Sequence, residues 1–163
     1  MTTEAQSEAR YEATVDRVYS TDQIDILWES KLCIHFAACI RGSIEAFNPQ
    51  RRPWVVPDAE PPERIDEIVA GCPTGALHVV WRDGRLPVSE PQHTVTFEPQ
   101  LDGPLFVRGP MEIRDRDGNL VRTDTRMALC RCGHSENKPF CDDSHYRVGF
   151  RSNDPQFGTE HGH

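Results

Sequence analysis

The chain has 163 residues, which allows one ordinary domain or two small ones, and 37% of the residues are hydrophobic. The formal net charge of −8 disfavours general binding to nucleic acid, because the phosphate backbone would repel an acidic chain. No run of about 18 apolar residues occurs and the N-terminus lacks the apolar region of a secretory signal, so neither a membrane span nor secretion is expected.

Six cysteines stand out in a chain of this composition. We expect a cytoplasmic location, where the reducing environment keeps thiols free. Cysteines in such a chain indicate metal ligation before disulfide formation.

The first third of the chain predicts a β-loop-β pattern. Residues 1–22 have no sustained apolar run and are expected to form a loose arm. Apolar and polar residues then alternate from Ile24 to Trp28, which is typical of a half-buried strand. A loop from Cys33 to Cys39 follows, and the stretch from Arg52 to Val56 is a candidate for a short strand.

A helix and a further strand complete this first unit. Pro62 can start a helix that runs to about Ala70, with apolar residues on one face, and Gly71 can end it. Cys72 begins a turn, and the apolar stretch from Ala76 to Trp81 predicts a strand. We therefore expect a first domain over residues 23–82.

The second half of the chain predicts a small β structure. Residues 83–92 are polar and proline-containing, as in a linker, and residues 152–163 form a polar tail. Between them, alternating apolar pairs predict strands, with turn signals at Gly103-Pro104 and Asp117-Gly118. The pairs are Val95/Phe97, Leu105/Val107 and Met111/Ile113. This second domain covers residues 93–151.

A dense group of metal-ligating residues closes the second domain, with the spacing C-x-C-x8-C-x3-H at Cys130, Cys132, Cys141 and His145. Cys130 and Cys132 can converge on one metal. Cys141 and His145 can face the same point if a helix begins near Asp142, and Asp142 or Asp143 could cap that helix. Three thiolates and one imidazole suit tetrahedral zinc. They also suit a [2Fe–2S] cluster with two ligands on each iron.

This stretch resembles the CDGSH iron–sulfur domain of the mitoNEET-like family, over roughly residues 93–151. The residues that match the family pattern are Cys130, Cys132, Ser135, Pro139, Cys141, Asp142, Ser144 and His145. Asp143 stands where the family has glycine, and aspartate tolerates the left-handed backbone better than most residues. The resemblance implies a [2Fe–2S] cluster held by the three cysteines and His145.

The first domain carries a second group of cysteines, Cys33, Cys39 and Cys72. A bacterial ferredoxin run reads C-x2-C-x2-C with a remote Cys-Pro, and here Phe36 occupies the middle cysteine position. Three thiolates suffice for a [3Fe–4S] cluster. A [4Fe–4S] cluster needs a fourth ligand, for which His35 is the nearest candidate.

Residues 24–81 resemble the divergent single-cluster ferredoxin family, which is also seen fused to CDGSH domains. The matching residues are Cys33, His35, Cys39, Phe47, Pro53, Trp54, Cys72, Pro73, Gly75, Ala76 and Leu77. Trp54 and Trp81 are interpreted as core residues. His78, His93, His161 and His163 have no partner pattern and are taken as ordinary residues, and His134 is expected to be exposed.

The sequence thus predicts an α+β fold, a small ferredoxin-like unit followed by a β-rich CDGSH unit with one short helix. We expect an electron-transfer protein with two clusters, because the sequence shows no catalytic triad, phosphate loop or paired acid and base. Storage, transfer or sensing of a cluster is the alternative, since an imidazole ligand can be protonated in competition with metal. A zinc-stabilised interaction module is a third.

The expected partners are redox proteins, a reductase or an oxidase. The acidic stretch from Asp58 to Glu67 is interpreted as a solvated helix start or as a docking surface for a basic partner. One CDGSH motif per chain implies a homodimer by resemblance, unless the ferredoxin unit occupies the partner's place.

Overall fold

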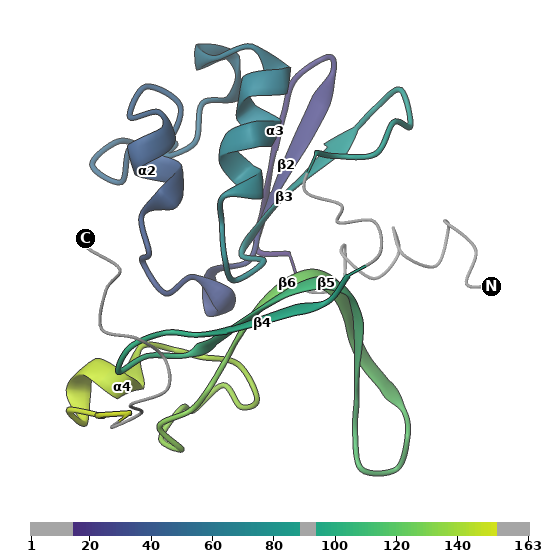
Figure 1. Ribbon diagram of the computed structural model, residues 1–163. Coiled ribbons are helices and arrows are strands. Elements are labelled where there is room, and N and C mark those ends of the chain that lie inside the picture. Colours follow the sequence, from purple (N-terminus) through teal and green to yellow (C-terminus); the bar gives the residue numbers. More distant parts are fainter. Residues whose placement is uncertain (1–14, 89–93, 153–163) are drawn as a thin grey trace.

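Two three-stranded antiparallel sheets and a few short helices form the structure, a computed structural model that describes residues 15–88 and 94–152 (Figure 1). The strands are β1 (Arg17–Ser20), β2 (Ile24–Trp28), β3 (Leu77–Trp81), β4 (Thr96–Pro99), β5 (Leu105–Arg114) and β6 (Leu120–Leu129). The α-helices are α2 (Ala38–Gly42), α3 (Pro62–Ala70) and α4 (Ser144–Arg147), and the 3-10 helices are η1 (Ser30–Leu32) and η2 (Pro57–Ala59). The fold is α+β, as the sequence predicts. Within the described ranges, no helix has the length and apolar character needed to cross a membrane.

The first unit is built by α3 packing on the sheet β1-β2-β3. Pro62 opens α3, where its missing N–H costs nothing, and Gly71 ends the helix and donates its N–H to the carbonyl of Ile68. One face of α3 is apolar and buried, and it lies against alternate residues of β2 and β3. The largest fully buried hydrophobic residues of this core are Ile24, Ile26, Phe47, Val55, Ile65 and Val69.

Two details of the first unit differ from the sequence prediction. Strand β1 lies within the stretch expected to be a loose arm, where Arg17 pairs with Trp28 of β2. This edge strand is short and mostly exposed, so it carries no apolar alternation from which it could be predicted. The candidate strand from Arg52 to Val56 is reduced to one bridge between Phe47 and Val55.

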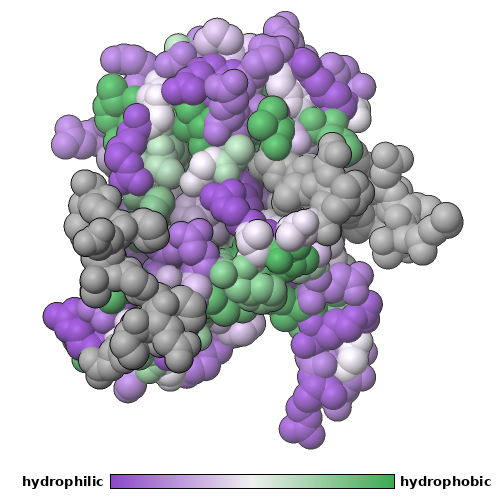
Figure 2. Space-filling model, in the orientation of Figure 1, coloured by the Kyte–Doolittle hydropathy of each residue, from purple (hydrophilic) through white to green (hydrophobic). Residues whose placement is uncertain are grey.

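The second unit also departs from the prediction. The apolar pairs expected in two strands belong to the single strand β5, whose pairing with β6 shifts register between Arg108 and Met111. Strand β6 was not predicted, because its buried side chains include the charged residues Arg122, Asp124 and Arg126. The tip of the β5–β6 hairpin projects from the body of the protein and is hydrophilic (Figures 1 and 2).

Arg126 joins the two units. Its side chain comes from β6 and is fully buried, and its guanidinium donates to the carbonyls of Val69, Cys72 (3.0 Å) and Leu77 (2.7 Å) in the first unit. Arg108 of β5 donates to the carbonyl of Ala70 at 3.1 Å. The two arginines therefore satisfy carbonyls at the C-terminus of α3, where the helix dipole also favours positive charge.

A buried ionic network surrounds Arg126. Arg122 lies 2.7 Å from Asp124 and 2.8 Å from Glu29 of the first unit, and His78 of β3 lies 3.3 Å from Asp124. Burial by itself raises the pKa of Asp124, but His78 and Arg122 outweigh burial and lower the pKa to about 2. This carboxylate therefore stays ionised at neutral pH.

Gly75 allows the two units to approach this closely. It adopts φ +72°, and a Cβ atom at this position would lie 2.5 Å from the carbonyl oxygen of Arg126. Any other residue would combine a left-handed backbone with a clash against β6.

We predict that Arg126→Met lowers the free energy of unfolding by at least about 3 kcal/mol, because three buried carbonyls lose their donor at roughly 1–3 kcal/mol each. Urea unfolding followed by circular dichroism measures this change. Arg64→Met is the control: Arg64 is half exposed and pairs with Glu67 on the surface, so its loss should cost only about 0–1 kcal/mol. Equal effects of the two substitutions would show that the Arg126 contacts contribute no more than a surface ion pair.

Candidate iron–sulfur sites

Cys33, Cys39 and Cys72 meet at one pocket in the first unit. Cys33 directly follows η1, Cys39 lies in α2, and Cys72 follows the C-terminus of α3. The pocket holds about 340 Å³ of space between atoms, part of it open to solvent. All three thiols therefore line one partly open pocket, as the ligands of a single metal centre would.

Most of the other side chains that line this pocket are apolar, among them Trp28, Ile34, Phe36, Trp54, Pro73 and Leu77. Trp54 and Trp28 pack edge to face at 5.1 Å between ring centroids. Such walls limit the access of water to the sulfurs. They also raise the cost of a bare thiolate, because a charge in an apolar site loses its hydration.

Burial accordingly raises the pKa of the Cys33 thiol, and it raises that of Cys39 to about 11. The neighbouring thiol of Cys72 contributes to both shifts, because two thiolates that lie close together repel each other. Backbone N–H groups of His35 and Ile40 oppose the shifts by donating toward Cys33 and Cys39. Three crowded thiols in an apolar pocket fit a metal cluster, whose positive irons would stabilise all three thiolates together.

The loop between Cys33 and Cys39 has an unusual backbone. His35 and Ala37 adopt left-handed φ values of 54° and 63°. Arg41 donates to the carbonyl of Phe36 at 2.9 Å and lies over its ring. The Phe36 ring, which stands where a ferredoxin has its middle cysteine, packs edge to face on Phe106 of β5 at 5.6 Å. The loop is therefore held in part by the second unit.

The second group of predicted ligands lies at the end of β6 and in the turn that follows it. The sulfurs of Cys130 and Cys132 are 3.7 Å apart, and the sulfur of Cys141 is 3.4 Å from Nδ1 of His145. The backbone brings the two pairs together. Cys130 N–H donates to Pro139 and Cys141 N–H donates to Ala128, which continues the β pairing at Leu129 and Phe140.

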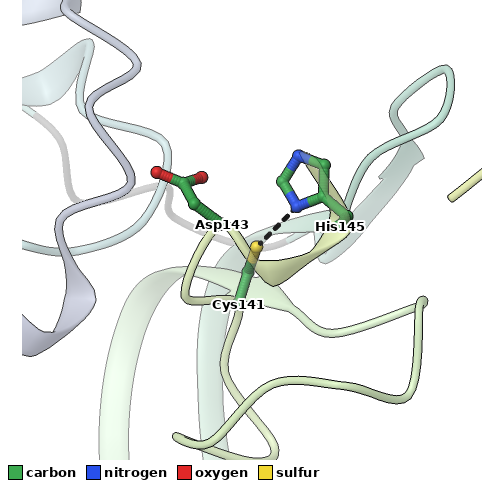
Figure 3. Close-up of side chains that lie close together, drawn as sticks. All are labelled: Cys141, Asp143 and His145. Atoms are coloured by element: carbon green, nitrogen blue, oxygen red, sulfur yellow. Dashed lines mark hydrogen bonds between the residues drawn. The ribbon is translucent and has the colours of Figure 1, made fainter. Parts of the chain in front are cut away.

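The N-cap residue of α4 is Asp143, whose side chain makes no cap hydrogen bond, so the predicted cap is replaced by contacts of Asp142 one residue earlier. The N–H groups of Ser144 and Glu136 donate to the carboxylate of Asp142 at 3.1 and 2.9 Å. Asp143 adopts the left-handed conformation, φ 69°, that its place in the motif requires. Figure 3 shows the Asp143 carboxylate and the His145 ring on opposite sides of the Cys141 sulfur.

The thiols of this site differ in their ionisation. Burial raises the pKa of Cys130, but backbone N–H groups of Ser135 and Gly133 and the Cys132 thiol outweigh it, so the pKa is lowered overall. Burial raises the pKa of Cys141 to about 11, helped by the nearby charges of Asp143 and Cys130. Since Cys130 acts on Cys141, the two ligand pairs lie within electrostatic reach of each other, as a shared cluster requires.

Both halves of the chain match known families. Residues 19–82 match the family model described as a divergent 4Fe-4S mono-cluster, and residues 102–146 match the one described as an iron-binding zinc finger of CDGSH type. The chain is also similar to the protein named "Uncharacterized protein YjdI" of Escherichia coli K12 and O157:H7. The identity is 34% over 61 residues, which are 37% of this chain and 80% of that protein.

The chain belongs to the divergent 4Fe-4S mono-cluster family. A CDGSH iron-binding domain follows the mono-cluster domain, so the predicted pair of domains is confirmed and the chain is an iron–sulfur protein. The individual ligands stay a prediction. The structure brings the three cysteines of the mono-cluster domain to one pocket, and it places the four predicted CDGSH ligands at one turn.

Two further residues lie near the sites: Asp143, which the sequence marks as the departure from the family pattern, and His78, which was not predicted to matter. Asp143 offers a carboxylate that lies, with the ligand atoms of Cys141 and His145, in a group whose members are all within 4.8 Å of one another. His78, taken from the sequence as an ordinary residue, contacts Arg126 at 3.3 Å and Asp124 between the two domains. His78 has no local sequence signal, because its contacts are with residues of the other domain.

The remaining predictions near the sites have mixed outcomes. His35 lines the mono-cluster pocket, but its side chain is 87% exposed and contacts Asp143. His134 is exposed as expected, and its backbone N–H, rather than its ring, points to the Cys132 sulfur at 3.4 Å. His93, His161 and His163 lie outside the described residues.

Three acidic residues of the stretch from Asp58 to Glu67 are buried or paired in the structure, so they add little free negative charge to the surface. Asp66 is buried and accepts from the indole of Trp81 at 2.8 Å and from the N–H of Val88 at 3.0 Å. Glu63 and Glu67 pair with arginines at 3.3 and 3.0 Å. The other acidic residues of this stretch are Asp58 and Glu60.

We predict an order of thiol reactivity for the cluster-free chain. At pH 8 a thiol with a pKa near 11 is about 0.1% thiolate, so Cys39 and Cys141 should react with iodoacetamide far more slowly than Cys130. Mass spectrometry of the labelled peptides over time gives the rates. In urea the differences should vanish, and equal rates in the folded chain would contradict the enclosed sites described above.

Proposed function

We propose that the chain is an electron-transfer protein that carries two iron–sulfur clusters and exchanges electrons with separate redox proteins. The observation that carries this proposal is that three cysteines of the first domain line one pocket, while the second domain brings its other potential ligands together as two close pairs, Cys130/Cys132 and Cys141/His145. One site lies in each domain. Two enclosed sites with cluster-type ligands suit a carrier of electrons more than a catalyst.

In the CDGSH domain, Cys130, Cys132, Cys141 and His145 would hold a [2Fe–2S] cluster. The side chains of Cys141 and His145 are buried, whereas those of Cys130 and Cys132 are partly exposed. The site thus has one protected side and one side near solvent, and the latter is a route by which a redox partner can come close. Such a cluster supplies one-electron chemistry when bound.

In the mono-cluster domain, Cys33, Cys39 and Cys72 would hold a cuboidal cluster. Three thiolates suit a [3Fe–4S] cluster, and the family description names a 4Fe-4S cluster. A fourth iron needs one more ligand. His35 lines the same pocket, so it is the candidate in the folded chain, although it would have to turn from its contact with Asp143.

Storage or transfer of a cluster is the second candidate function. It is favoured by the partial exposure of Cys130 and Cys132, which lets an acceptor's thiols reach that side of the CDGSH site. Incubation of the loaded chain with a cluster-free acceptor protein separates the two functions. A carrier keeps its iron in this experiment, whereas a donor loses it to the acceptor.

The first test of the proposal is the iron content. We expect about five irons per chain with a [3Fe–4S] cluster, or about six with a [4Fe–4S] cluster, each including two in the CDGSH domain. Cys39→Ser should remove one visible spectral species and Cys141→Ser the other. A count of about two irons would remove the mono-cluster site, and a colourless chain that contains zinc would overturn the proposal.

A second test addresses the position of Phe36. If the mono-cluster site holds three irons, the oxidised protein should show the paramagnetic signal of a [3Fe–4S] centre, and Phe36→Cys should allow conversion to [4Fe–4S]. Electron paramagnetic resonance measures both states. If the wild type already holds four irons and His35→Ala loses one of them, the histidine is the fourth ligand and the three-iron assignment is wrong.

A further inference from the structure

The two candidate cluster sites touch each other across the domain boundary. Nδ1 of His35, in the loop after Cys33, lies 3.5 Å from Oδ2 of Asp143, in the turn between Cys141 and His145. Beside this contact, Ile34, Phe106, Ala128 and Cys141 form one buried apolar cluster. The cysteine loop of the first site thus packs directly on a predicted ligand of the second.

Asp143 lies in the CDGSH site and contacts His35, which lines the other site. Its carboxylate shares the 4.8 Å group with Cys141 and His145 on its own side. Its other carboxylate oxygen, Oδ1, is buried without a hydrogen-bond partner. Its charge also acts on the mono-cluster site, because it contributes to the raised pKa of the Cys33 thiol as well as to that of Cys141.

The backbone at this contact is unfavourable by itself. Asp143 and His35 both adopt left-handed φ values, 69° and 54°, which residues other than glycine rarely adopt. A glycine at 143 would fit the turn without strain. Strained residues of this kind persist where the surroundings fix them, and they cluster at functional sites.

We propose that Asp143 couples the two cluster sites: its negative charge, held between Cys33 and the Cys141–His145 pair, sets the reduction potentials of both clusters together. This inference rests on the two-cluster function proposed above and adds the residue that links the sites. The effect is electrostatic. A fixed negative charge near a cluster opposes the arrival of an electron, and in an enclosed, poorly screened site it acts over a longer distance than in water.

The test is a redox titration of the loaded, full-length chain, in which the visible spectrum and electron paramagnetic resonance follow each cluster separately. Asp143→Asn removes the charge and keeps the shape, and Asp143→Gly also relieves the backbone. Both substitutions should raise the potentials of both clusters, because each reduced cluster gains stability when the negative charge is removed.

Asp142→Asn is the matched control. Asp142 is the adjacent carboxylate, and its charge acts on Cys141. Its two oxygens accept separately from Ser144 and Glu136, so an asparagine keeps one of these two hydrogen bonds. Its loss should raise the potential of the CDGSH cluster alone. If Asp143→Asn and Asp143→Gly also shift only that cluster, Asp143 does not couple the sites and the inference is overturned.

Iron content and the number of redox steps in the wild type separate this result from the function itself. Two steps with about five or six irons support the two-cluster proposal whatever the variants do. A single step removes that proposal, and the coupling with it.

Discussion

The buried guanidinium of Arg126 is the interaction on which the arrangement of the two domains depends. It leaves β6 of the CDGSH domain and ends among the carbonyls of Val69, Cys72 and Leu77, which lie at the end of α3 and around the last cysteine of the mono-cluster site. A buried cation is tolerated only where donors and charges are satisfied. The segment that carries Cys72 is therefore positioned by a residue from the other domain.

The same constraint explains why both candidate sites lie near the domain boundary. Phe106 and Ala128 of the CDGSH sheet pack against Ile34 of the cysteine loop, and the Cys141 side chain completes this cluster. Small cluster-binding domains have thin cores for their length, since burial rises with chain size. Each domain here supplies part of the small apolar cluster that lies between the two sites.

The elements that depend on local sequence patterns could be predicted, whereas those that depend on contacts between distant residues could not. Strand β2, helix α3 and the two cysteine groups follow from periodicity, caps and ligand spacing, which act over a few residues. Strand β6 was not predicted because several of its buried side chains are charged. A charged residue in a sequence indicates an exposed position unless its distant partner is known. The burial of Asp66 against Trp81 and the contact of His35 with Asp143 depend on partners 15 and over 100 residues away, which no short pattern reveals.

The charges near the sites divide into two systems. Arg122 pairs with Asp124 and Glu29, and Arg126 neutralises the carbonyl dipoles of the Cys72 segment, so the positive groups of the boundary are already engaged. The thiolates are stabilised instead by backbone N–H groups. These belong to His35 and Ile40 at one site and to Gly133 and Ser135 at the other. Neutral dipoles stabilise negative charge without cancelling it. The Asp143 carboxylate lies between the two sites, where His35 contacts one of its oxygens and the other is buried without a hydrogen-bond partner, which is why one residue can influence both.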